Sequence, residues 1–363
     1  MSVTINGTSG LVFNDASTQN TAANGFGFKN RIINGSMVID QRNAGAAVTS
    51  GFSVDRFKSD FNVSGKLQYQ QANATAVGFT KAVTLTSLSA YTLNSGDVFV
   101  YRQLIEGFNV ADLGWGTANA KTVTASFWVK ASITGTYSFA VGNGAGNRSY
   151  VTTFSIPTAN TDTYITITIP GDTSGTWATD NSTGLVIGWE QGASGASLVT
   201  STTNTWQAAG YQKATGTVSL VNTNAATFTI TGVQLEKGST ATSFDYRPYG
   251  TELALCQRYY LLLASGASKA FAMGSYQTSA YIEGVVSFPV TMRSTPALEA
   301  TSGTDYYGIY ANGADKFDTL LSEYLNVNSA TVYNTTQVSG TAGYGGWFFT
   351  SNANAKVAFT AEL

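Results

Sequence analysis

The sequence predicts an all-β protein: an antiparallel β-sandwich, then a short helix and a smaller C-terminal β domain. The chain has 363 residues, which is long enough for two domains. Only 11% of the residues are charged, whereas Gly occurs 38 times, Tyr 19 times and Phe 20 times. This composition is typical of β-structure rather than of helices. Apolar and polar residues also alternate with a period of two in many short runs, as in half-buried strands.

Residues 1–25 are short of apolar side chains and contain one strand-like patch, at residues 10–13. A segment of this composition cannot bury a core of its own. Two interpretations are open for it: a disordered tail, or a segment that becomes ordered against another protein.

The stretch from residue 26 to 249 contains the runs that predict the sandwich. In KTVTASFWVK, Val123, Ala125, Phe127 and Val129 share one face, and Trp128 lies on the other. The same alternation groups three further sets: Tyr137, Phe139 and Val141; Ile165, Ile167 and Ile169; Leu185, Ile187 and Trp189. Short strands separated by Gly, Asn and Ser turns at this spacing predict a β-sandwich.

One predicted strand changes its register. Phe228 and Ile230 share one parity, whereas Val233 and Leu235 have the other. A bulge of one residue at Gly232 would return both pairs to the same core, so we expect a kink there.

The period changes after residue 249, where apolar residues recur every three or four positions around Cys256. This spacing predicts a helix over residues 250–262, with Gly250-Thr251-Glu252 as its cap. Cys256 is the single cysteine of the chain, so it cannot form an intrachain disulfide, and we predict a small buried side chain. Strand-like runs resume after the helix and predict a β domain over residues 263–363.

The composition disfavours several classes of function. The chain has no histidine, so it cannot form a Ser-His-Asp triad, a Cys-His pair or a His-ligated zinc site. Its net charge is −2 with no block of basic residues, which disfavours a nucleic-acid groove. We expect no membrane insertion, because no apolar run approaches the ~18 residues of a spanning helix. The first ten residues lack the order of a secretory signal, so we expect a protein made and kept in the cytosol, or released by lysis.

Carboxylates are the main acid–base groups of the sequence. Asp162, Asp172, Asp180 and Glu190 fall within a 29-residue stretch, but three of them stand in turn-like sequence, where Asp favours bonds to nearby backbone. A glycosidase needs two carboxylates that face one bond, so we predict solvated or turn carboxylates and no catalytic residue. Glu236 is either structural or a ligand of Ca²⁺. We predict no cofactor and no other metal site.

The isolated charges form a separate group. Asp55, Arg56, Arg42 and Arg247 have apolar neighbours in the sequence. In a chain with so few charges, this pattern predicts paired, half-buried structural ions.

Aromatic residues offer a binding site in place of a catalytic one, because a ring stacks on the C–H face of a sugar and its O–H or N–H adds a hydrogen bond. Trp128 is either an exposed platform or covered by another element or chain. Trp177 and Trp206 stand in loop-like sequence, where they either pack under their own loops or contact a ligand or subunit. In the C-terminal domain most aromatics are assigned to the core and the rest to a binding rim. The predicted ligand-binding residues are Trp128, Trp177, Trp206, Tyr306, Tyr307 and Tyr310.

Three parts of the sequence resemble tailed-bacteriophage fibre proteins. GLVFNDASTQNTAANG, at residues 10–25, is similar to the strand-plus-TQxTAA segment at the attachment end of phage fibres. FKNRIINGSMVIDQRNAG and FSVDRFKSD, at residues 28–45 and 52–60, resemble the opening of a common phage β-sandwich module. ITGVQLEKGSTATSFDYRPYGTELALCQRYYLLL, at residues 230–263, resembles its close and the helix that follows. SFPVTMRSTPALEA, at residues 287–300, is similar to the entry to a C-terminal β domain.

This resemblance implies a virion surface or tail-fibre protein with a jelly-roll sandwich similar to carbohydrate-binding modules. It implies attachment to other virion proteins through residues 1–25, self-association as a homotrimer, and contact with host surface polysaccharide without catalysis. The expected location is the virion, after assembly in the host cytoplasm. Several copies would convert weak glycan contacts into avidity.

Two alternatives come from other classes. One is a structural capsid-decoration or fibre-shaft component, in which the aromatics pack subunits against one another. The other is a polysaccharide depolymerase, which the missing pair of carboxylates disfavours.

Overall fold

The computed structural model describes residues 28–363 continuously and three short strands before them. These strands pair antiparallel in the order β1-β2-β3 and span β1 (Thr4–Asn6), β2 (Gly10–Val12) and β3 (Thr18–Gln19). The strand-like patch predicted at residues 10–13 corresponds to β2. Apart from β1, β2 and β3, the predicted attachment segment, residues 1–25, lies outside the described residues.

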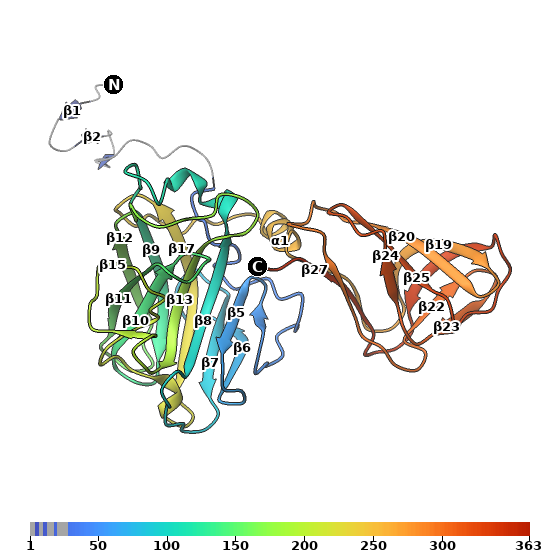
Figure 1. The fold of residues 1–363 in the computed structure, drawn as a ribbon, viewed down its shortest axis with the longest axis horizontal. Helices are drawn as coiled ribbons and strands as arrows, with labels where there is room; N and C mark the ends of the chain where they lie inside the picture. The colour runs from blue at the N-terminus through green and yellow to red at the C-terminus, as the bar shows by residue number, and fades with distance from the viewer. Residues whose placement is uncertain (1–3, 7–9, 13–17, 20–27) are drawn as a thin grey trace.

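Two antiparallel sheets form the larger body, which is the predicted β-sandwich (Figure 1). The seven-stranded sheet has the order β15-β11-β10-β13-β8-β5-β4: β4 (Phe52–Val54), β5 (Phe57–Phe61), β8 (Val98–Glu106), β10 (Gly135–Gly142), β11 (Ser149–Ile156), β13 (Thr183–Ala193) and β15 (Trp206–Gln207). The five-stranded sheet has the order β12-β9-β17-β7-β6: β6 (Leu67–Asn73), β7 (Lys81–Ser87), β9 (Val123–Ala131), β12 (Thr163–Ile169) and β17 (Thr227–Lys237). Smaller elements complete this body: the parallel pair β14 (Val199–Thr200) and β16 (Lys213–Ala214), and the 3₁₀ turns η1 (Gly107–Asn109), η2 (Ala111–Leu113) and η3 (Leu220–Asn222).

The core of the sandwich lies between the two sheets and follows the predicted alternation. The four apolar residues of β9 that share a face are all buried: Val123, Ala125, Phe127 and Val129. The rings of Phe127, Phe139 and Trp189 meet at the centre, with centroid distances of 5.3 to 5.6 Å. Phe127 comes from the five-stranded sheet, and Phe139 and Trp189 come from the seven-stranded sheet. The contact between these large rings therefore packs the two sheets together.

The kink predicted at Gly232 is present in β17. From Thr231 to Gln234 the strand advances three residues, while its partner β9 advances two, from Trp128 to Ser126. Gly232 has a φ of +62°, which glycine adopts without a steric penalty. The apolar residues on both sides of the bulge all enter the core: Phe228, Ile230, Val233 and Leu235.

The predicted helix is present but shorter than expected. α1 spans Tyr249–Gln257, and β18 (Tyr260–Ser265) begins three residues later, so the prediction of helix through residue 262 was wrong. Tyr260 pairs instead with Thr360 of β27 (Lys356–Thr360), where the β ladder replaces a further helical turn. The helix is also capped differently, because Pro248 holds the N-cap position and makes no side-chain cap bond. Cys256 is fully buried, as predicted.

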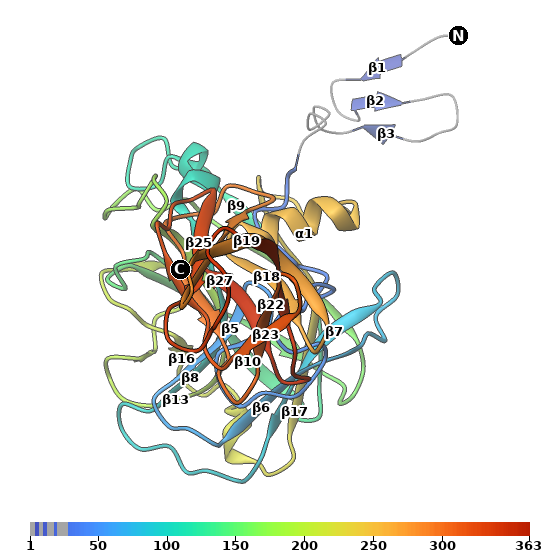
Figure 2. The ribbon, with the colours of Figure 1, turned by 90° about the vertical axis from the view of Figure 1, so that its right-hand side faces the viewer.

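The C-terminal domain contains two sheets and its own core. The three-stranded sheet has the order β18-β27-β21, with β21 at Ala297–Ala300. The second sheet has the order β23-β22-β26-β19-β20-β25-β24: β19 (Lys269–Thr278), β20 (Tyr281–Ser287), β22 (Tyr307–Tyr310), β23 (Ala314–Phe317), β24 (Leu321–Glu323), β25 (Ser329–Asn334) and β26 (Gly345–Thr350). Tyr307, Phe348 and Phe359 are among its fully buried residues. Figure 2 shows this domain in front of the sandwich.

The two stretches that resemble the opening and the close of the phage module lie side by side. The side chain of Asn30 donates to the carbonyl of Val233 at 3.0 Å and accepts from the backbone of Leu235 at 3.0 Å. Arg247 pairs with Glu252 at 3.2 Å, and its guanidinium also donates to backbone carbonyls of the opening stretch. Apart from the Arg247–Glu252 pair, these bonds join residues more than 200 positions apart, so they close the sandwich next to α1.

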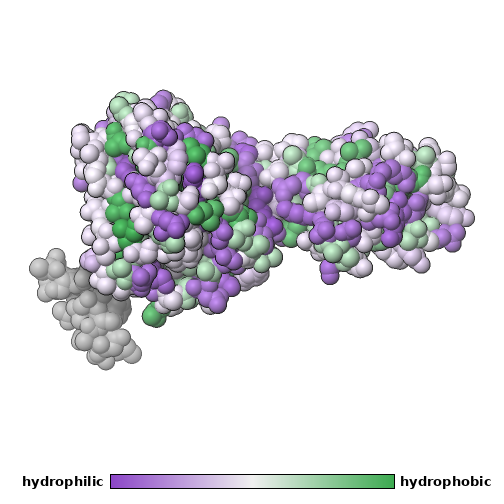
Figure 3. Space-filling model, turned by 90° about the horizontal axis from the view of Figure 1, so that it is seen from below, coloured by the Kyte–Doolittle hydropathy of each residue, from purple (hydrophilic) through white to green (hydrophobic). Residues whose placement is uncertain are grey.

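Charged residues join the two domains. Arg42 and Arg56 both pair with Glu362, and their guanidinium groups lie 3.5 Å and 3.6 Å from the ring centroids of Tyr260 and Tyr259. The predicted structural ion pairs are therefore confirmed for both arginines and for Arg247. Asp55 is buried as well, but it accepts hydrogen bonds from Gln41 rather than joining an ion pair. On the face seen in Figure 3, hydrophilic residues gather where the two lobes meet.

Candidate functional site

An aromatic groove lies on the outer side of the five-stranded sheet, away from the sandwich core. It encloses about 270 Å³ between β9, β12, the turn before β7 and the segment after β17. Its five rings are Phe79, Trp128, Tyr164, Phe244 and Tyr246. We call this surface the aromatic groove.

The sheet register brings the groove together. Trp128 lies directly opposite Tyr164 in the β9–β12 ladder, and their ring centroids are 5.1 Å apart. The bulge at Gly232 gives room to Phe79, whose ring atoms would lie 2.6 Å from a Cβ at position 232. Phe79 then packs on Tyr246, at a centroid distance of 5.7 Å. Phe244 meets Phe79 edge-on at 5.0 Å.

The groove offers open ring faces and hydroxyl groups. Tyr164 is 43% exposed and Tyr246 is 58% exposed, while Trp128 is half-buried. The Tyr246 hydroxyl donates to the carbonyl of Gly78, and burial raises its pKa above the ordinary tyrosine value, so it stays neutral near pH 7. Among the described residues that line the groove there is no carboxylate, thiol or cationic side chain. This arrangement can stack on a ligand and form hydrogen bonds with it.

Trp177 and Trp206 meet in a cluster with Trp115, which the sequence analysis did not single out. The three ring centroids are 4.7 to 5.4 Å apart. Each indole N–H is bonded to a backbone carbonyl: that of Lys121, Ser174 or Pro170, at 2.7, 3.1 and 2.7 Å. The interpretation of packing against loops therefore applies to Trp177 and Trp206, although Trp177 also borders a cavity.

The three predicted tyrosines of the C-terminal domain have different surroundings. Tyr307 is fully buried and donates to backbone carbonyls, so its prediction as a ligand-binding residue was wrong. Tyr306 is half-buried and packs against the domain core. Tyr310 is 46% exposed and stacks on Trp347, with ring centroids 4.9 Å apart. Tyr310 is therefore the member of this set whose ring is open to solvent.

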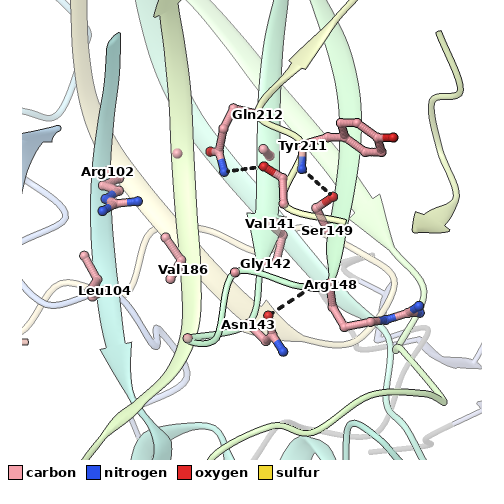
Figure 4. Close-up of a pocket in the computed structure, with 15 residues that line it drawn as sticks. Arg102, Leu104, Val141, Gly142, Asn143, Arg148, Ser149, Val186, Tyr211 and Gln212 are labelled. Atoms are coloured by element: carbon pink, nitrogen blue, oxygen red, sulfur yellow. Dashed lines mark hydrogen bonds between the residues drawn. The ribbon is translucent and has the colours of Figure 1, made fainter. Parts of the chain in front are cut away.

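A polar trench crosses the outer side of the seven-stranded sheet (Figure 4). It encloses about 110 Å³, and an adjoining cavity of about 310 Å³ shares Arg102 and Gln212 with it. The walls are held by local bonds: Gln212 donates to the carbonyl of Gly210 at 3.2 Å, and the backbone of Arg148 donates to Asn143 at 3.1 Å. No sequence motif marks this trench, because its lining comes from four strands, the turn between β10 and β11, and the loop before β16. Its aromatic content is low, with Tyr211 as one lining ring.

Three of the four carboxylates considered as catalysts have partners of their own. Asp172 accepts two bonds of 2.7 Å from Arg148, and Asp180 accepts from Ser182 within its own turn. Glu190 is fully buried beside Lys213 at 3.3 Å, and desolvation raises its pKa to about 7 despite this cation.

Glu236 has a structural role. Its two oxygens accept from the backbone and hydroxyl of Thr242, at 2.8 and 2.7 Å, and from the Gln234 amide at 2.8 Å. The carboxylate thereby fixes the segment that carries Phe244 and Tyr246 into the groove. Within residues 28–363 and the three N-terminal strands, no group of three or more Asp, Glu, Cys or His residues is placed to hold a metal ion.

Comparisons with known proteins give matches at the level of solved structures. No family model matches the chain, and no curated protein matches its sequence. An enzymatically active domain of tailspike protein 4 from bacteriophage CBA120 is 11% identical with a TM-score of 0.34, covering 58% of this chain and 22% of that one. The family 11 carbohydrate-binding module of the Clostridium thermocellum cellulase Lic26A-Cel5E is 11% identical with a TM-score of 0.28, covering 55% and 98%.

A third match is the CBM22-1 xylan-binding domain of Paenibacillus barcinonensis Xyn10C, 10% identical with a TM-score of 0.25, covering 55% of this chain and 99% of that one. All three TM-scores are below 0.5. In the described part of the chain, no helix has the length and apolar character needed to cross a membrane.

Proposed function

We propose that the protein is a non-enzymatic glycan-binding protein and that the aromatic groove is its binding surface. The observation that carries the proposal is the group of five rings around one cavity on the outside of the sheet. Stacking of such rings on pyranose C–H faces, with hydrogen bonds from Tyr164 and Ser243, is a binding mode that requires no reaction. Because the lining is uncharged, the expected ligand is a neutral stretch of polysaccharide.

The biological setting follows from the sequence resemblance. We propose a phage virion fibre protein that attaches through residues 1–25 to other virion proteins and binds host surface glycans during adsorption. Self-association as a homotrimer would bring several grooves to one cell surface and raise the avidity. The proposal of a phage fibre protein rests on the resemblance of residues 10–25, 28–60 and 230–300 to phage fibre proteins.

A screen of the full chain against immobilised host-type polysaccharides tests the binding role. We expect saturable retention on at least one neutral polysaccharide and no increase in reducing ends during long incubation. A new reducing end that appears in proportion to protein and time would show a depolymerase. Absence of retention on every polysaccharide would contradict the binding role.

A structural role is the second candidate, and an exposed row of residues in the C-terminal domain favours it. Tyr310, Trp347, Met273 and Val285 are directly opposite one another on β22, β26, β19 and β20. All four are 44% to 68% exposed. Such a continuous apolar row fits packing between subunits better than contact with a sugar.

A further inference from the structure

A second cavity lies at one end of the sandwich, between two loops. It has a volume of about 220 Å³ and is bounded by the stretch from residue 110 to 117 and by the stretch from residue 177 to 185. The rings of Trp115 and Trp177 meet at 84° and form one corner of it. Val110, Leu113 and Leu185 supply aliphatic walls. We call this cavity the end pocket; it shares no lining residue with the aromatic groove.

The two loops are fixed to each other on both sides of the end pocket. On one side, the backbone of Gly107 donates to Ser182 at 2.8 Å, and the backbone of Phe108 donates to Asp180 at 2.9 Å. On the other side, the backbone of Gly116 donates to Asp172 at 2.7 Å. The approach is so close that a Cβ at position 107 would lie 2.5 Å from the carbonyl oxygen of Ala178. The pocket is therefore held open by backbone contacts and does not depend on a ligand to form.

Three of the four polar side chains around the end pocket already have hydrogen-bond partners. The indole N–H groups of Trp115 and Trp177 donate to the carbonyls of Lys121 and Ser174, so the rings present carbon faces to the cavity. The Thr117 hydroxyl donates to the carbonyl of Gly114 at 2.6 Å. Thr179, at the exposed rim, adds a further hydroxyl. Among the described residues that line the pocket there is no charged side chain, so a charged ligand would lose its hydration without a counter-ion.

We propose that the end pocket binds a neutral, largely apolar group of about the size of one six-membered ring. An enclosed apolar cavity of roughly 150 Å³ accepts a benzene ring, so the volume suits a ring with one or two substituents. The aromatic corner and aliphatic walls favour hydrocarbon contact, and the rim threonines leave room for a single hydroxyl. This site is separate from the proposed glycan surface and does not depend on it.

Three ring-sized probes test the chemistry with the full chain: cyclohexanol, myo-inositol and cyclohexanecarboxylate. Tryptophan fluorescence, summed over the six tryptophans of the chain, responds to a ligand beside Trp115 and Trp177, and isothermal titration calorimetry gives the affinity. We expect saturable binding of cyclohexanol with a dissociation constant on the order of 1 mM, and at least about tenfold weaker binding of the other two. Equal binding of myo-inositol, or no saturable response to cyclohexanol, would overturn the proposal.

Two alanines of the same loop provide a matched pair of variants. Ala111 is exposed at the surface and lines the pocket, whereas Ala118 is exposed outside the lining. Ala111→Phe should fill the cavity and weaken cyclohexanol binding at least about tenfold. Ala118→Phe should bind cyclohexanol with a dissociation constant within about twofold of that of the unmodified protein. Both variants should melt at the unmodified temperature. Trp128→Ala should leave cyclohexanol binding unchanged, which separates failure of this site from failure of the aromatic groove. Cyclohexanol binding that survives Ala111→Phe would assign it to another place and overturn the proposal.

Discussion

The carboxyl group of Asp55 is fully buried, and desolvation raises its pKa from 3.8 to about 7, although hydrogen bonds from Gln41 and the charge of Arg42 lower it. In the unfolded chain this group ionises near pH 4, whereas in the folded protein it stays protonated until about pH 7. The unfolded state therefore loses its proton first as the pH rises. The contribution of Asp55 to stability is greatest below pH 4 and is lost progressively up to pH 7.

At this residue, we expect Asp55→Asn to make the free energy of unfolding less dependent on pH. The free energy of unfolding of the unmodified protein should contain a term that falls by a few kcal/mol between pH 4 and pH 7, and the variant should lack it. Urea unfolding at several pH values measures the difference. Asp305→Asn, at an exposed carboxylate, is the control. If the free energy of unfolding changed with pH equally in Asp55→Asn and in the unmodified protein, the raised pKa of Asp55 would be contradicted.

Individual site residues were predictable only where strand alternation reveals them. Trp128 could be predicted, because its parity places it opposite to Phe127 and Val129. Phe79 joins it through a turn 49 residues earlier in the sequence, and Tyr246 through a segment 118 residues later. No local pattern indicates either contact. Tyr307 was assigned wrongly, since its strand carries aromatics on both faces and parity alone did not indicate which face is buried.

At the scale of elements, the bulge in β17 was predictable because a parity change and a glycine coincide at position 232. The end of α1 was not, because the apolar residues 259–263 satisfy a helical spacing and a strand equally well. Pairing with β27, about 100 residues later, decides between the two. Periodicity thus gives the strands of the sandwich, whereas the change from helix to strand depends on a distant partner.

Gly232→Ala tests the bulge and its role in the groove. The substitution should cost about 1–3 kcal/mol, because alanine is strained at a φ of +62° and its Cβ would displace the Phe79 ring. Gly65→Ala is a matched control with a φ of +71° and no atom near the added Cβ. We expect a larger fall in melting temperature for Gly232→Ala and a loss of glycan binding for that variant alone. If Gly232→Ala and Gly65→Ala changed the melting temperature and the glycan binding equally, the position of Phe79 would not depend on the bulge.

At the scale of the whole molecule, the apolar row from Tyr310 to Val285 predicts self-association through the C-terminal domain. Light scattering at micromolar concentration should give an oligomer, which we propose to be a trimer, since the exposed row would otherwise remain in water. Trp347→Glu should shift the mass toward the monomer, whereas Leu88→Glu, at an exposed position of the sandwich, should not. A monomer mass for the unmodified protein at every concentration would contradict this prediction.

Deletion of residues 1–25 tests the attachment function. The sandwich core and the junction with the C-terminal domain are built from residues after position 28, so the truncated chain should melt within a few degrees of the full chain. Virus particles assembled in the presence of the truncated chain should not contain it. Normal incorporation, or loss of folding, would contradict an anchor at this end.

The central claim is that the aromatic groove binds glycans, and the paired effect of Trp128→Ala on affinity and stability tests it most directly. The control is Phe108→Ala, which removes an exposed aromatic ring of the sandwich that does not line the groove. Calorimetric titration with the best polysaccharide from the screen should show at least about tenfold weaker binding for Trp128→Ala per folded molecule, with a small change in melting temperature, because the ring is half-buried and its stacking on the ligand is lost. Phe108→Ala should keep the unmodified affinity. A large fall in melting temperature for Trp128→Ala with unchanged affinity would assign the residue to structure and contradict the claim.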